Sequence, residues 1–217
     1  MDNNQRSNIG YLGRASYSYD DRYFFTGSYR RDGASVFGVN QKWGDFFAFG
    51  GAWRLSSEKF MSSISYLDDL KLKVSWGKNG NQGLDPYGTL STINNGASGG
   101  VRYEFGGSDI IYGLNQKALG NANLGWETTE SWNTGFESAW LGSRLFVDLD
   151  LYFSKTTDQI FTRDIPVMTG FKNMKSSMGQ VNNRGVELTI RSVNINTQDW
   201  YWTTNLTFWL NRNKLVH

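Results

Sequence analysis

Residues Arg144–Ser154 read Arg-Leu-Phe-Val-Asp-Leu-Asp-Leu-Tyr-Phe-Ser. Every odd-numbered position in this stretch is apolar, whereas the even-numbered positions include Asp148 and Asp150. Successive side chains of a β-strand point to opposite faces, so the stretch predicts a strand with one apolar and one polar face. Aspartate is a poor strand former and is costly to bury, so the polar face is expected to contact water.

The same two-residue period recurs along the chain. Further alternating stretches lie at residues 11–19, 23–31, 45–55, 70–76, 128–138, 185–191 and 200–211. About eight strands are therefore expected, joined in sequence order as antiparallel hairpins. The apolar face of such a sheet packs on a core in a soluble β-sandwich and contacts lipid in a membrane barrel.

The connections between these stretches differ in length at the two ends of the predicted sheet. Short turns are expected at residues 20–22, 139–143 and 194–199, and long loops at 77–126 and 155–178. Residues 56–69 form a longer link on the short-turn side, with a helical turn expected around Phe60 and Met61. Short turns on one side and long loops on the other are typical of outer-membrane barrels. The expected fold is thus all-β, with antiparallel up-and-down hairpins forming part of a large transmembrane β-barrel.

Composition excludes several classes of protein. A hydrophobic content of 39% and a mean hydropathy of −0.51 argue against a bundle of membrane-spanning helices. The chain has no cysteine and one histidine, His217, so disulfides, thiolate chemistry, Ser-His-Asp catalysis and histidine zinc sites are excluded. A net charge of +2 is too balanced to indicate a nucleic-acid partner.

Charged side chains on the polar faces of the strands are the first candidate site. They are predicted to face a barrel lumen and comprise Arg14, Lys71, Lys73, Glu137, Asp148, Asp150, Glu187 and Arg191. Asp148 and Asp150 would stand about 6–7 Å apart, a separation that resembles the carboxylate pair of an inverting glycosidase. Acidic side chains are nevertheless expected in any polar barrel interior, so no catalytic residue is predicted.

Aromatic side chains in the long 77–126 connection are the second candidate site. Tyr87, Tyr103 and Trp126 are predicted ligand-binding residues, because aromatic faces stack on sugar rings and neighbouring amides bond hydroxyl groups. The alternative is that these rings pack the loop against itself or against a partner protein. The loop contains neither a phosphate-binding motif nor the ligand spacing of an EF-hand, so no metal or cofactor is expected.

Several segments resemble the SusC/RagA family of TonB-linked outer-membrane transporters. The resemblance rests on Leu-Gly-Arg-Ala-Ser-Tyr-Ser-Tyr at 12–19, Arg-Arg-Asp-Gly-Ala-Ser at 30–35, Leu-Lys-Leu-Lys-Val-Ser-Trp-Gly at 70–77, Gly-Asn-Gln at 80–82, Leu-Gly-Trp-Glu at 124–127, Asp-Ile-Pro-Val at 164–167 and Gly-Gln-Val-Asn-Asn-Arg-Gly-Val-Glu at 179–187. These segments cover nearly the whole chain in the order of the family.

The resemblance implies a plugged transport barrel of roughly 22 strands, of which about eight would lie in residues 1–217. The signal peptide, the plug domain and the final strands are expected to be absent from this sequence. The family implies import of glycan oligomers or peptides across the outer membrane, together with a SusD-like surface lipoprotein and a TonB complex reached through the missing parts. The expected protein is not an enzyme. The alternative function is a soluble β-sandwich carbohydrate-binding module.

Overall fold

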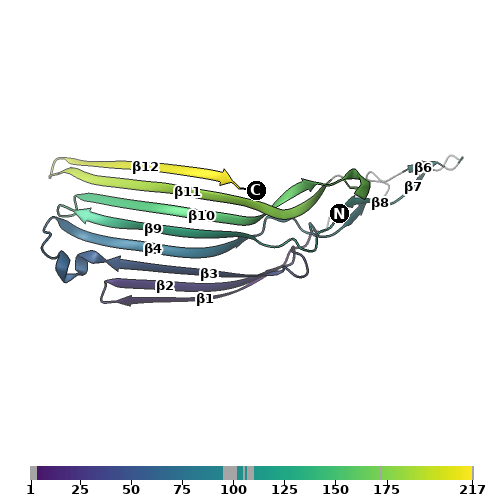
Figure 1. The fold of residues 1–217 in the computed structure, drawn as a ribbon. Helices are drawn as coiled ribbons and strands as arrows, with labels where there is room; N and C mark the ends of the chain where they lie inside the picture. Colours follow the sequence, from purple (N-terminus) through teal and green to yellow (C-terminus); the bar gives the residue numbers. More distant parts are fainter. Residues whose placement is uncertain (1–3, 95–101, 105, 107–109, 172, 217) are drawn as a thin grey trace.

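The computed structural model describes residues 4–94, 102–104, 106, 110–171 and 173–216, so that His217 lies outside the described part. Eight long strands form one sheet in these residues (Figure 1). They are β1 (Asn8–Tyr19), β2 (Tyr23–Ala34), β3 (Trp43–Arg54), β4 (Leu67–Asn81), β9 (Glu127–Trp140), β10 (Leu145–Asp164), β11 (Asn173–Asn196) and β12 (Tyr201–Leu215). Their order in the sheet is β1-β2-β3-β4-β9-β10-β11-β12, and every neighbouring pair is antiparallel. The predicted up-and-down meander is confirmed.

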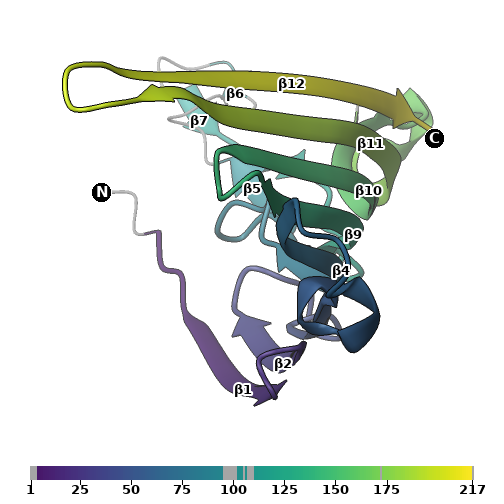
Figure 2. The same cartoon turned by 90° about the vertical axis from the view of Figure 1, so that its left-hand side faces the viewer.

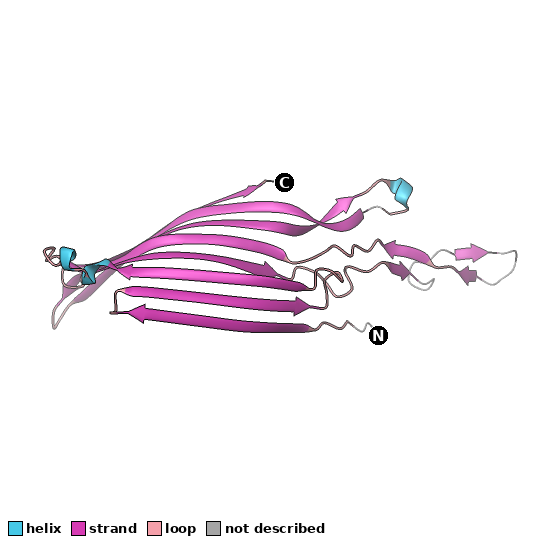
Figure 3. Ribbon diagram, turned by 60° about the horizontal axis from the view of Figure 1, so that its bottom comes forward, coloured by secondary structure: helices cyan, strands magenta, loops and turns pink. Residues whose placement is uncertain are grey.

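The sheet is a curved wall that runs from β1 at one edge to β12 at the other (Figure 2). The 3₁₀ turns η1 (Leu55–Ser57) and η2 (Lys59–Met61) lie at the end with the short turns (Figure 3). The predicted helical turn is therefore present, although no side chain caps either 3₁₀ turn. No helix in the described part of the chain is long and apolar enough to cross a membrane.

The opposite end of the sheet carries the long connections (Figure 3). The connection between β4 and β9 contains four short strands, β5 (Thr92–Asn94), β6 (Arg102–Glu104), β7 (Ile110–Tyr112) and β8 (Asn115–Ala118), which pair as β5–β8 and β6–β7. The turn η4 (Val167–Thr169) lies between β10 and β11. The predicted difference in connection length between the two ends is thus confirmed.

One row of side chains crosses the whole sheet on its apolar face. The cross-strand partners in this row are Tyr19, Tyr23, Trp53, Leu72, Phe136, Leu149, Leu188 and Phe208, one from each long strand. Direct partners in an antiparallel sheet have side chains on the same face, so eight apolar or aromatic side chains form a continuous belt. The first three rings stack in succession, with centroids 6.5 Å and 6.2 Å apart.

No second layer covers this apolar face in the described structure. Val74 is 51% exposed, Trp132 52% and Phe208 54%. The buried hydrophobic cluster lies elsewhere, at the end with the long connections, and consists of Ala34, Val36, Phe37, Phe46, Leu84, Leu124 and Trp126. A β-sandwich buries this kind of face under a second sheet, so the soluble sandwich alternative is wrong.

Strand length is the main difference from the prediction. Residues 155–178 were expected to form a loop, but β10 continues to Asp164 and β11 begins at Asn173. The two strands stay paired beyond a register shift next to Asp158, which has a φ of 60°. The apolar residues of this extension do not alternate with polar ones, since Ile160 and Phe161 are adjacent in β10, so hydrophobic alternation could not indicate it.

Glu58, in the link between η1 and η2, gives a pH-dependent prediction. Its carboxylate accepts hydrogen bonds from the Tyr23 hydroxyl (2.7 Å) and the Trp53 indole (3.1 Å). These two bonds lower the pKa of Glu58 from its ordinary value. A lowered pKa contributes stability that is complete above the ordinary pKa and is lost as the pH falls through the lowered value.

We therefore expect amide protection of residues 55–61 to decrease when the pH falls below about 4, after correction for intrinsic exchange rates. The Glu58→Gln variant should show little change in protection over the same pH range. An equal loss of protection in both proteins would contradict the assignment to Glu58.

Candidate functional site

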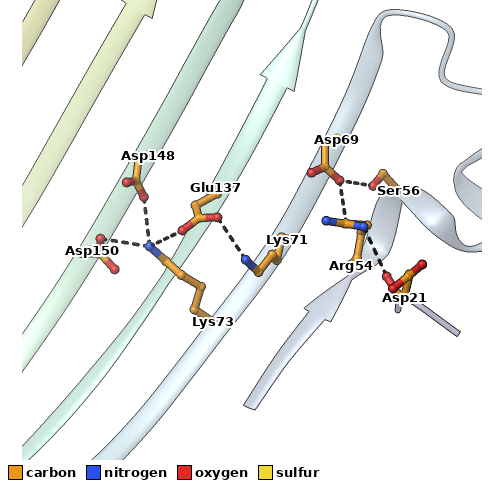
Figure 4. Close-up of polar contacts among 9 residues, drawn as sticks. All are labelled: Asp21, Arg54, Ser56, Asp69, Lys71, Lys73, Glu137, Asp148 and Asp150. Atoms are coloured by element: carbon orange, nitrogen blue, oxygen red, sulfur yellow. Dashed lines mark hydrogen bonds and ion pairs between the residues drawn. The ribbon is translucent and has the colours of Figure 1, made fainter. Parts of the chain in front are cut away.

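A cluster of charged side chains lies on the polar face of the sheet, centred on Lys73 of β4 (Figure 4). The Lys73 ammonium is 3.1 Å from a carboxylate oxygen of each of Glu137, Asp148 and Asp150. Lys71 is 3.3 Å from the other oxygen of Glu137. Two ammonium groups thus meet three carboxylates, and the cluster as a whole carries a negative charge. We call these five residues the Lys73 cluster.

A glycine allows Lys73 to reach two strands away. Lys73 lies opposite Gly135 of β9, and Gly135 lies opposite Asp150 of β10. A Cβ atom at Gly135 would be 2.0 Å from the backbone oxygen of Leu149 and 2.7 Å from Asp150 Oδ1. A larger residue would therefore fill the space over β9 that the lysine spans. Lys73 lies on β4 and Asp150 on β10, and the absence of a side chain at Gly135 allows the two charged groups to come into contact over β9.

A second group of charges lies on the same sheet nearer the short-turn end (Figure 4). Arg54 of β3 is 3.4 Å from a carboxylate oxygen of Asp69, and it donates a hydrogen bond to the backbone oxygen of Asp21. The Ser56 hydroxyl donates to the same Asp69 carboxylate. Arg54 is also the cross-strand partner of Lys71. Since each cation has its own carboxylate partner, these neighbouring positive charges are compensated.

The remaining predicted polar residues lie around the Lys73 cluster or at the sheet edge. Glu187 is the cross-strand partner of Asp150 on β11. The Arg191 guanidinium lies 4.3 Å from the centre of the Phe146 ring and lines a cavity of about 330 Å³ together with Glu137 and Asp148. Arg14 lies on the edge strand β1, opposite Ser28, and is not part of the cluster.

The three predicted ligand-binding aromatics have different surroundings. Trp126 is only 9% exposed and packs on Phe37 and Phe46, with ring centroids 4.7 Å and 5.3 Å away. Its indole donates to the backbone oxygen of Lys42. Phe46 belongs to β3 and Phe37 to the connection between β2 and β3, so Trp126 packs outside its own loop, which neither alternative from the sequence specified. Trp126 forms no part of the ligand surface proposed below. Tyr103 is exposed on β6, in the paired ribbon with β7.

Tyr87 lines a cavity of about 760 Å³ at the end with the long connections. The cavity walls come from three separate segments, which include Arg6 near the start of the chain, Lys42 before β3 and Leu90 after Tyr87. Sequence reasoning missed this cavity, because residues 4–7 and 35–42 have neither periodicity nor a motif. The cavity carries two cationic side chains and a mixture of polar and apolar walls, which suits an extended polar ligand better than a small apolar one.

The uncovered apolar belt and the charged opposite face together define a wall segment of a transmembrane β-barrel. The comparison with known families identifies which barrel. Residues 1–214 match the family described as TonB dependent receptor-like, beta-barrel, and the chain belongs to that family. Members of this family are outer-membrane receptors and transporters and are not enzymes.

Individual relatives agree with the family match. The chain is 36% identical over 203 residues to TonB-dependent receptor P39 of Formosa agariphila, covering 94% of this chain and 19% of the relative. It is 34% identical over 212 residues to TonB-dependent receptor SusC of Bacteroides thetaiotaomicron, covering 96% and 21%. The chain therefore spans about a fifth of the length of these relatives.

Solved structures of the RagAB peptide importer share the fold. The open-open state superposes with a TM-score of 0.86 and 25% identity, covering 98% of this chain and 22% of that chain. The closed-closed state gives a TM-score of 0.82, also with 25% identity, covering 96% and 22%. The resemblance to the SusC/RagA family seen in the sequence is confirmed.

Proposed function

We propose that residues 1–217 form part of the barrel wall of a TonB-dependent importer in the outer membrane. The observation that carries the proposal is the belt of eight apolar side chains across an uncovered sheet. Contact of such a belt with lipid acyl chains is favourable, whereas its exposure to water is unfavourable. The apolar face is therefore assigned to lipid and the polar face, with the Lys73 cluster, to the barrel interior.

The charges of the Lys73 cluster support this orientation. A lysine or arginine on the lipid face costs about 2–4 kcal/mol at the midplane of the bilayer. Lys71 and Lys73 lie beside Leu72 in β4, and Asp148 and Asp150 lie beside Leu149 in β10. Turning the sheet over would place all four charges in lipid, so only one orientation satisfies both faces.

The proposed cargo is an oligomer, either a glycan or a peptide, delivered with a SusD-like surface lipoprotein and moved with energy relayed by TonB. The support is the similarity to SusC and to the RagAB peptide importer. The cavity of about 760 Å³ beside Tyr87 lies at the long-connection end, which faces the cell exterior in barrels of this topology. It is proposed as one surface that the cargo contacts during entry.

An uptake experiment tests this proposal. Cells with and without the gene for the full receptor would be given labelled oligopeptides or labelled oligosaccharides, with and without a protonophore. We expect one cargo class to enter only the cells that have the receptor, and the protonophore to abolish this uptake. Uptake that is equal in both strains for both cargo classes would contradict the proposal. An antibody against residues 144–154 checks that the receptor is present in the outer-membrane fraction.

A further inference from the structure

Two arginines face each other at the border of the apolar belt. Arg184 of β11 and Arg212 of β12 are direct cross-strand partners, and both side chains are exposed. They lie in the row next to Val186 and Leu210, which are themselves partners. Together with Gly185 these four residues line a pocket of about 280 Å³.

The arginine pair lacks a compensating charge in the described structure. Neither arginine takes part in any of the ion pairs among the described residues. Their neighbours along the strands, Asn183, Asn211 and Asn213, are uncharged. Like charges directly opposite each other destabilise an antiparallel pair. An anion between the two guanidinium groups would convert this repulsion into two charge-assisted contacts.

The position of Arg212 along β12 gives the depth of the arginine pair in the membrane. The distance is measured from Trp202, an aromatic residue at the short-turn end of β12, because aromatic residues flank the apolar band of such barrels. Arg212 lies ten residues further along β12, which corresponds to about 33 Å along the strand. At a strand tilt near 40° this is about 25 Å across the membrane. This height matches the apolar band of an outer-membrane barrel. The arginines therefore lie at the border of the band on the side of the long connections. In the next row, Lys155 and Lys214 lie on either side of Asn182.

We propose that Arg184 and Arg212 bind the phosphate of a lipid headgroup in the outer leaflet. Arginine suits this ligand because its planar fork donates to two phosphate oxygens at once. A lipid fits better than free phosphate, because the exposed side chains of Leu206, Phe208 and Leu210 continue the same face into the apolar band, where acyl chains would lie. The inference rests on the proposed function for the orientation of the barrel.

The test uses the full receptor purified in detergent, with native mass spectrometry as the readout. The probes are a diphosphorylated diglucosamine lipid and the same lipid after removal of its phosphates. We expect the wild-type receptor to bind the phosphorylated lipid about tenfold more tightly or better. The Arg184→Gln/Arg212→Gln double variant should lose that preference. The matched control is Lys117→Gln/Arg163→Gln, which removes the same charge from exposed residues outside the row and should behave like the wild type.

The outcomes separate this inference from the proposed function. A double variant that binds both lipids like the wild type, while the receptor is folded in the outer membrane, would overturn the lipid site alone. Inorganic phosphate that displaces the lipid at equal concentration would overturn the assignment to a lipid headgroup. Absence of the wild-type receptor from the outer membrane would contradict the proposed function. Thermal unfolding without lipid should be similar in the double variant and the wild type, because both arginine side chains are exposed.

Discussion

Leu149→Arg is expected to reduce sharply the amount of folded receptor in the outer membrane. Leu149 lies in the row of eight apolar side chains, between Phe136 and Leu188. An arginine near the bilayer midplane costs about 2–4 kcal/mol, and no carboxylate is available on that face of the neighbouring positions to offset it. The readout is the fraction of receptor in outer-membrane extracts that migrates as the compact, unheated form on a gel.

Asn133→Arg is the matched control for this variant. Asn133 lies on β9, on the opposite face of the sheet, as the partner of Tyr152. An arginine there would point to the barrel interior, so its effect on assembly should be small. Equal losses from the two substitutions would contradict the assignment of the apolar face to lipid.

Lys73→Met is expected to destabilise the barrel wall by about 2 kcal/mol. The methionine keeps most of the side-chain volume but leaves Glu137, Asp148 and Asp150 without the ammonium that holds them together. The expected loss is moderate, because the lysine side chain is 27% exposed and water screens part of the repulsion. The readout is the denaturant midpoint of the full receptor, followed by tryptophan fluorescence.

A second substitution tests the cause of this loss. Asp150→Asn in the Lys73→Met background removes one of the three repelling charges, so the double variant should recover part of the lost stability. Additive losses would show that the lysine acts through packing alone and would contradict the electrostatic account of the Lys73 cluster.

The meander could be predicted from the sequence wherever one face of a strand is apolar. Val147, Leu149 and Leu151 alternate with Asp148 and Asp150, as expected of a strand with one face toward lipid and one toward water. Beyond Ser154 the alternation stops, because Ile160 and Phe161 are adjacent and the other residues to Asp164 are polar or charged, although the strand continues to Asp164. The ends of the long strands therefore could not be located from hydrophobic periodicity.

The two-residue period also predicted on which face of the sheet the candidate site residues lie, but it did not predict which residues they contact. A shift of one residue in register would move Asp148 and Asp150 to the apolar face, and the pairing of β10 with β9 and β11 fixes that register. No pattern in the sequence indicates that Gly135 leaves the space over which the Lys73 side chain extends. The burial of Trp126 depends on Phe37 and Phe46, which are remote in the sequence.

Spin labels placed one at a time at residues 145–154 of the full receptor test the central claim most directly. Residues 1–217 contain no cysteine that would compete for the label. In outer-membrane vesicles, collisions with lipid-soluble oxygen should peak at odd positions such as Leu149 and Leu151. Collisions with a water-soluble nickel chelate should be more frequent at Asp148 and Asp150. Oxygen collisions that peak at even positions, or that show no two-residue period, would contradict a barrel wall with its apolar belt in lipid.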